Sequence, residues 1–144
     1  MIARETIYAA LWGIAAQAAD FVTADRRLRH WTDLSPAEQP ALFMTEKGGL
    51  AETKALGAPV VWTLYADFYL YVHSSDPYLA PSSALNPLVD ALEAALAPLP
   101  ATGVQDLGLP AMVSHAYLAG KIETDEGVLG DQAVAIVPVA IVCV

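Results

Sequence analysis

The clearest structural signal in this chain lies in residues 60–73, VVWTLYADFYLYVH. Apolar side chains alternate there with Thr, Tyr, Asp and His side chains, and a period of two is typical of a β-strand whose two faces differ. The apolar set suits a protein core and consists of Trp62, Leu64, Ala66, Phe68, Leu70 and Val72. The opposite face carries three tyrosines, which suit a partly covered surface. The stretch therefore predicts a long, half-buried strand.

Two stretches with apolar residues at helical spacing flank this strand. The first lies between Ile2 and Ala19 and has a stripe of Ile7, Leu11, Ile14 and Ala18. The second has a stripe of Leu85, Leu88, Val89, Leu92 and Leu96, and Pro98 and Pro100 end it. It begins either at a Ser82 or Ser83 cap, or at Asn86 with Pro87 in the first helical position. We expect both stripes to pack on the apolar face of the long strand.

Four further segments complete the predicted fold as strands: Phe21–Arg29, Pro40–Glu46, Met112–Glu123 and Gln132–Val142. The turn-rich stretch Thr124–Gly130 joins the last two as a hairpin. Pro138 lacks an N–H donor, so the last strand is expected at a sheet edge or with a bulge. The order α-β-β-β-α-β-β predicts one α+β domain over residues 1–144. Its antiparallel sheet has about five strands, with both helices on one face.

The segment Lys47–Pro59 is predicted to be a loop, since it contains three glycines and several charges. We interpret Gly48 and Gly49 as a flexible hinge. A loop of this length is unusual between neighbouring strands. We therefore expect it to be poorly ordered in a free subunit and ordered by a neighbouring subunit or another protein partner. Its candidate interface residues are Lys47, Gly48, Gly49, Glu52 and Lys54.

Composition favours burial against other subunits. Hydrophobic residues make up 56% of the chain, against roughly 45–50% in typical soluble domains. A membrane-spanning helix needs about 20 consecutive apolar residues. The longest apolar run, Ala133–Val144, has 12 residues and contains Pro138. Since a membrane span is not expected, the apolar excess indicates contacts between protein subunits.

The net charge of −9 is unevenly distributed along the chain. Residues 1–54 hold six of the seven basic residues and seven acidic ones, whereas residues 55–144 hold nine acidic residues and only Lys121. Tight nucleic-acid binding requires basic groups that neutralise phosphates. We therefore expect no specific binding of DNA or RNA.

No arrangement typical of catalysis or cofactor binding is found in the sequence. His30, His73 and His115 lie in unrelated segments, and Cys143 lies in an apolar run that predicts a buried, inert thiol. The chain has no G-x-S-x-G, P-loop or G-x-G-x-x-G motif. We expect a protein that is not an enzyme and that has no cofactor or metal.

Two charged clusters are candidate interaction sites. Arg26, Arg27 and Arg29 lie on a predicted strand, with Arg27 and Arg29 on one face. They either dock a neighbour's carboxylates or protect an exposed strand edge. An acidic hairpin tip follows later in the chain and lacks the residue spacing of a calcium loop. Its members are Glu123, Asp125, Glu126 and Asp131.

An ordered set of stretches gives a family resemblance that covers nearly the whole chain. The stretches are MIARETIYAAL at residues 1–11, RRLRHW at 26–31, QPALFM at 39–44, the long strand Trp62–His73, LNPLVDALEAAL at 85–96 and IETDEG at 122–127. In order and spacing they resemble the tail terminators, the small tail-completion proteins of phages and prophages with long non-contractile tails.

The resemblance implies a ring, usually hexameric, that caps the finished tail tube, stops its polymerisation and offers the surface that joins the head. It implies an α+β fold with helices packed on a sheet, no catalytic residues, and a place at the head-proximal end of the virion tail after assembly in the host cytoplasm. The implied partners are further copies of the chain, the tail tube protein and head–tail connector proteins. DNA is expected to pass through the ring without specific binding.

The acidic hairpin then has two possible roles. Glu123, Asp125, Glu126 and Asp131 either line the channel and repel DNA, or contact a neighbouring subunit or the tube. Two other classes of function also stay open. One is a head–tail connector subunit or another virion structural protein, and the other is a small ligand-binding or enzymatic α+β domain.

Overall fold

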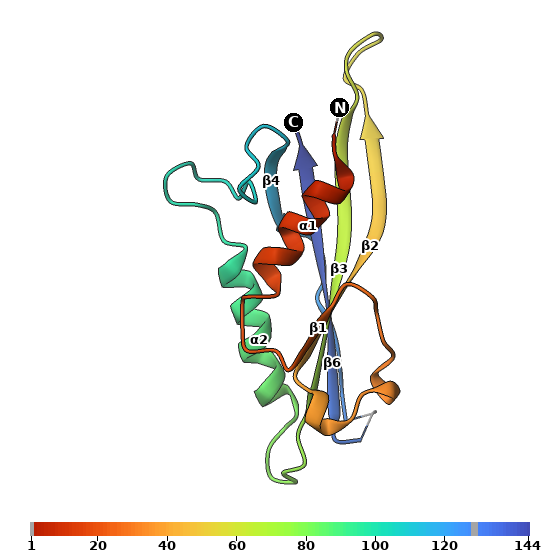
Figure 1. Ribbon diagram of the computed structural model, residues 1–144, viewed down its shortest axis with the longest axis vertical. Coiled ribbons are helices and arrows are strands. Elements are labelled where there is room, and N and C mark those ends of the chain that lie inside the picture. The colour runs from red at the N-terminus through yellow and green to blue at the C-terminus, as the bar shows by residue number, and fades with distance from the viewer. Residues whose placement is uncertain (1, 128–129) are drawn as a thin grey trace.

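A six-stranded sheet with two α-helices on one face makes up the part of the chain that the computed structural model describes, residues 2–127 and 130–144 (Figure 1). The elements are α1 (Arg4–Ala15), β1 (Thr23–Asp25), β2 (Ala41–Glu52), β3 (Val61–His73), α2 (Ser82–Ala95), β4 (Val113–Leu118), β5 (Glu123–Glu126) and β6 (Gln132–Cys143). Two short 3-10 turns, Trp31–Asp33 and Pro36–Glu38, lie between β1 and β2. The predicted α+β class with two helices is confirmed.

The long strand predicted from the sequence is β3, and it lies inside the sheet. The strand order is β1-β2-β3-β6-β4. β5 also pairs with β6, on the same side as β4 but with an earlier part of the strand. β3 is antiparallel to both β2 and β6. β1 runs parallel to β2, so the sheet is mixed rather than wholly antiparallel.

The helix-covered face of the sheet contains the main core. Alternate β3 residues from Leu64 to Val72 are buried there, as the period of two predicts, while Trp62 at the strand start packs on them partly exposed. Leu11 of α1 and Leu92 of α2 are buried against this face, and Ile14 and Val89 pack at its margin. Phe68 has no exposed surface and lies within this cluster.

The strand predicted over Phe21–Arg29 is wrong in length. Only Thr23–Asp25 pairs with β2, and the chain then turns because the Asp25 side chain accepts a hydrogen bond from the backbone N–H of Arg27. Arg26, Arg27 and Arg29 therefore lie in the connection after β1, not on a strand with alternating faces.

The loop predicted over Lys47–Pro59 is also wrong in its first half. β2 continues to Glu52 and pairs with β3, with a register shift between Glu46 and Gly49. Gly48 has φ +82° at this shift, a left-handed conformation that suits glycine at a β-bulge. The Tyr8 hydroxyl lies within hydrogen-bond distance of the Tyr65 and Gly48 carbonyl oxygens, at 2.9 and 3.3 Å. The two glycines thus form a bulge and not a hinge.

Pro138 lies in the interior strand β6, so the expected edge position is wrong. Pro138 is opposite Asp67 of β3, and its carbonyl accepts a hydrogen bond from Ala119 N–H on the other side, at 3.0 Å. N–H and C=O of one strand residue point the same way, so the missing donor faces residues 119–122, where β4 and β5 are interrupted. The predicted strand Met112–Glu123 is divided at this point.

The second helix begins at Ser82, and Pro87 lies inside it rather than at its first position. Neither Ser82 nor Ser83 caps it with a side chain. Instead, a carboxylate oxygen of Glu126 in β5 accepts a hydrogen bond from Ser82 N–H. The negative charge also suits the positive end of the helix dipole.

Candidate interaction surface

The sheet face away from the helices is only partly covered. The connection between β1 and β2 packs over one end of it, where Leu34, Ala41, Phe43 and Tyr71 form a second, smaller buried cluster. The Tyr71 hydroxyl donates to the Arg29 carbonyl at 2.8 Å. Burial, and next the neighbouring Tyr69, raise the pKa of Tyr71 to about 12. This hydrogen bond attaches the connection to the sheet.

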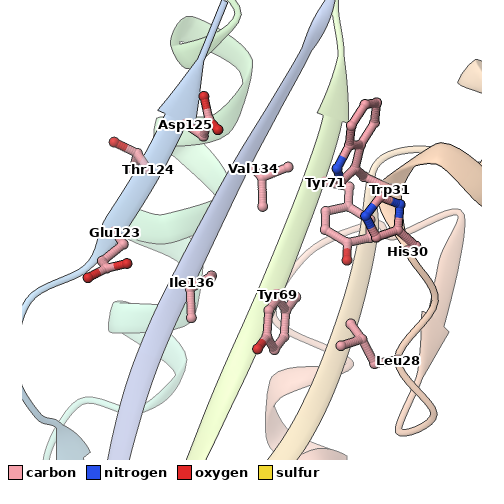
Figure 2. Close-up of a pocket in the computed structure, with 10 residues that line it drawn as sticks. All are labelled: Leu28, His30, Trp31, Tyr69, Tyr71, Glu123, Thr124, Asp125, Val134 and Ile136. Atoms are coloured by element: carbon pink, nitrogen blue, oxygen red, sulfur yellow. The ribbon is translucent and has the colours of Figure 1, made fainter. Parts of the chain in front are cut away.

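Beside this cluster lies a groove of about 570 Å³, here called the open-face groove. Figure 2 shows its floor between two walls: β5 supplies one wall, and the connection after β1 supplies the other. The floor consists of Tyr69 and Tyr71 of β3 with Val134 and Ile136 of β6. The walls are Glu123, Thr124 and Asp125 on one side, and Leu28, His30 and Trp31 on the other.

The groove combines an apolar, aromatic floor with carboxylates on one wall. Within residues 2–127 and 130–144, no basic side chain lies within ion-pair distance of Glu123 or Asp125. Lys121 lies near Glu123 at one end, and the nearby Lys47 pairs with Asp67 at 3.7 Å. Such a surface suits an apolar side chain accompanied by a cation.

The acidic hairpin does not form a single charged tip. Glu123 and Asp125 line the open-face groove, whereas Glu126 lies at the start of α2. Asp131 is exposed, and its carbonyl accepts a hydrogen bond from Ser74 N–H at 2.8 Å. The strand alternation separates Asp125 from Glu126. Whether any of the four lines a channel stays a prediction.

Two of the three arginines make contacts within the subunit. Arg26 pairs with Glu5 and, at 3.5 Å, with Glu46. The hydrogen bond from Arg26 lowers the pKa of Glu5. Arg29 pairs with Glu38 at 3.1 Å, while Arg27 is exposed. Arg27 therefore presents the more accessible guanidinium for a partner, and the interface role of the cluster stays a prediction.

The β2–β3 hairpin carries the remaining candidate interface residues. Glu52 ends β2, Lys54 follows it, and residues 53–60, here called the hairpin tip, connect the strands. Figure 1 shows the tip projecting beyond both chain ends at one end of the molecule. Leu56 has a fractional exposure of 106%, the largest among the exposed large apolar residues that the structure describes.

The histidines lie apart, and Cys143 is buried. His30 lines the groove, and His115 Nδ1 accepts a hydrogen bond from Gln105 N–H at 3.0 Å. Burial raises the pKa of the Cys143 thiol, which agrees with the prediction of an inert side chain. Among the described residues, no group of three or more His, Cys, Asp or Glu side chains is arranged to hold a metal ion.

In residues 2–127 and 130–144, no helix is long and apolar enough to cross a membrane. A scan of protein-family models and a search of curated proteins found no match to this chain.

The open-face groove was not predicted from the sequence. Its one signal was the row of tyrosines on the second face of residues 60–73, which indicated a partly covered surface. One wall ends about 30 residues before β3 and the other begins 50 residues after it, and their meeting depends on the strand order.

Proposed function

We propose that the protein is a structural subunit of a phage tail. It assembles into a ring, six-membered as in the tail terminators it resembles, that caps the tail tube, stops tube polymerisation and provides the head-attachment surface. Its partners are other copies of the chain, the tube protein and the head–tail connector proteins. DNA passes through the ring without specific binding.

The observation that carries this proposal is the one-sided covering of the sheet. Helices bury one face, whereas the other face retains an apolar groove open to solvent, and Leu56 is fully exposed on the hairpin tip. Together with the apolar excess of the chain, these surfaces suit a subunit that completes its burial by assembly. The family resemblance supplies the tail and the ring.

Two measurements test the proposal. Native mass spectrometry and electron microscopy of the purified 15.2 kDa chain, alone and with purified tail tubes, should detect rings and additional density at one tube end. Antibody labelling of complete virions should place the protein at the junction of tail and head. A protein that remains monomeric with and without tubes and is missing from virions would refute the proposed function.

A ligand-binding domain is a second candidate because the groove has the volume of small-molecule sites. Trp31 lines the groove, so a bound ligand should change its fluorescence, and Trp31→Phe should remove that part of the response. Native mass spectrometry of gently purified protein that shows a stoichiometric small molecule would favour this candidate over the ring.

A further inference from the structure

We propose that the hairpin tip of one copy inserts into the open-face groove of the next copy. Leu56 then packs on the apolar floor, and Lys54 pairs with Glu123 and Asp125 on the wall. This contact rests on the proposed assembly into a ring. It names the two surfaces that join neighbouring subunits.

The hairpin tip has the properties of an inserted element. Leu56 is fully exposed, and the turn that contains it is closed by a 3.0 Å hydrogen bond from Ala58 N–H to the Ala55 carbonyl. Gly57 supplies the positive φ of +81° that the turn needs. The paired ends of β2 and β3, up to Glu52 and Val61, support the tip from below. A tip held in this way loses little conformational freedom when it binds.

The groove complements the tip in both shape and charge. Its floor of Tyr69, Tyr71, Val134 and Ile136 offers apolar surface to a leucine side chain. Lys54 is the one charged residue among residues 53–60, and no described carboxylate lies within ion-pair distance of it. Glu123 and Asp125 likewise have no described cationic partner. An apolar contact supplies most of the affinity, and the charges select the orientation.

The tip cannot occupy the groove of its own subunit. β3 leaves the tip at Val61, and Tyr69 lies eight residues further along the strand, about 26 Å away at the rise of an extended chain. Figure 1 shows the tip pointing away from the rest of the molecule. Any hairpin tip that enters the groove therefore comes from a second copy.

A tip-to-groove contact joins two different surfaces, and such heterologous contacts build rings when their rotation closes. Each subunit would give one tip and receive one. This property separates the proposal from a symmetric pairing of two grooves, which would stop at a dimer.

Two variants disable one surface each. Leu56→Asp leaves the groove intact but removes the apolar tip, and Ile136→Glu places a charge on the groove floor while leaving the tip intact. Each variant alone should be a folded monomer, with a dissociation constant raised about tenfold or more. Leu79→Asp is the matched control, because Leu79 is also an exposed leucine in a loop, at 55% exposure. It should assemble like wild type.

Mixing the two variants gives the decisive result. The intact tip of the Ile136→Glu variant can enter the intact groove of the Leu56→Asp variant. The remaining groove and the remaining tip are both disabled, so native mass spectrometry should show a one-to-one heterodimer and no ring. The Lys54→Glu variant should assemble more weakly than wild type. Adding Glu123→Lys and Asp125→Lys to that variant should restore assembly, because the opposite charges then face each other again. Circular dichroism and thermal melts should be used to check that every variant is folded.

Three outcomes would overturn the contact. The first is Leu56→Asp assembling like wild type, which leaves the proposed ring intact but moves its interface elsewhere. The second is two folded monomeric variants that fail to form a heterodimer. The third is a wild-type chain that remains monomeric in all conditions, in which case labelling of virions still decides the proposed function on its own.

Discussion

Phe68 is the residue on which the main core most depends. It lies in the middle of β3, has no exposed surface and packs in the cluster shared with both helices. Phe68→Ala should lower the free energy of unfolding by about 3–5 kcal/mol, since the lost contacts and the cavity add. Urea denaturation measures the change. Tyr78→Ala, at a residue 93% exposed, should change it by less than about 0.5 kcal/mol. A loss below about 1 kcal/mol for Phe68→Ala would contradict the burial.

Tyr71 should make the stability of the protein depend on alkaline pH. Burial raises its pKa from 10.0 to about 12. A raised pKa in the folded state means that this stabilisation is complete below about pH 10 and is lost as pH rises through about 12. Alkali should therefore destabilise the folded protein over this window.

Tyr71→Phe removes this titration together with the hydrogen bond to the Arg29 carbonyl. At neutral pH the variant should lose about 1 kcal/mol. Between about pH 10 and pH 12, its free energy of unfolding should fall less steeply than that of wild type, as measured by urea denaturation at each pH. Parallel curves for the two proteins over that window would contradict the assignment.

At the scale of elements, two glycines should respond in opposite directions to the same change. Gly13 is exposed in α1, and a Cβ there meets nothing within 4 Å, so Gly13→Ala should stabilise the protein by about 0.5–1 kcal/mol through helix propensity. Gly48 has φ +82° at the bulge in β2, and Gly48→Ala should destabilise it by about 1–2 kcal/mol. Urea denaturation compares both. A neutral Gly48→Ala would argue against the bulge.

The elements that could be predicted from sequence are those with a strong period. β3 and the two helix stripes were predicted correctly, apart from Ala18, which lies beyond the end of α1 at Ala15. The period was strong because burial on one face fixes which side chains are apolar. The predicted β2 was too short because glycine is typical of both loops and bulges. At Gly48 the strand continues through a bulge, because the residues that follow pair with β3. The predicted β1 was too long because the strand ends at a turn made by the Asp25 side chain. The open-face groove could not be predicted because it depends on the strand order, which no local sequence pattern gives.

At the scale of the whole molecule, the charge should keep the protein from binding DNA. Its net charge is −9, with nine acidic residues and one basic residue after residue 54. Fluorescence anisotropy with duplex DNA should show no binding even at about 10 mM salt, where phosphate contacts are strongest. The double variant Glu126→Lys, Asp131→Lys should bind DNA more strongly than wild type at low salt, and no more strongly than wild type at high salt. Wild-type binding that falls steeply with salt would contradict the proposed free passage of DNA.

The break opposite Pro138 also affects how the sheet ends. β4 and β5 together form one margin of the sheet, and the interruption at residues 119–122 leaves only two short segments there. On the other margin, β1 covers the first residues of β2, and the Gly48 bulge distorts the rest. Long, regular margins act as templates on which foreign chains add strands and aggregate. With both margins broken, backbone-driven growth is disfavoured. Association is left to side-chain surfaces, which allow assembly to stop at a defined number of copies.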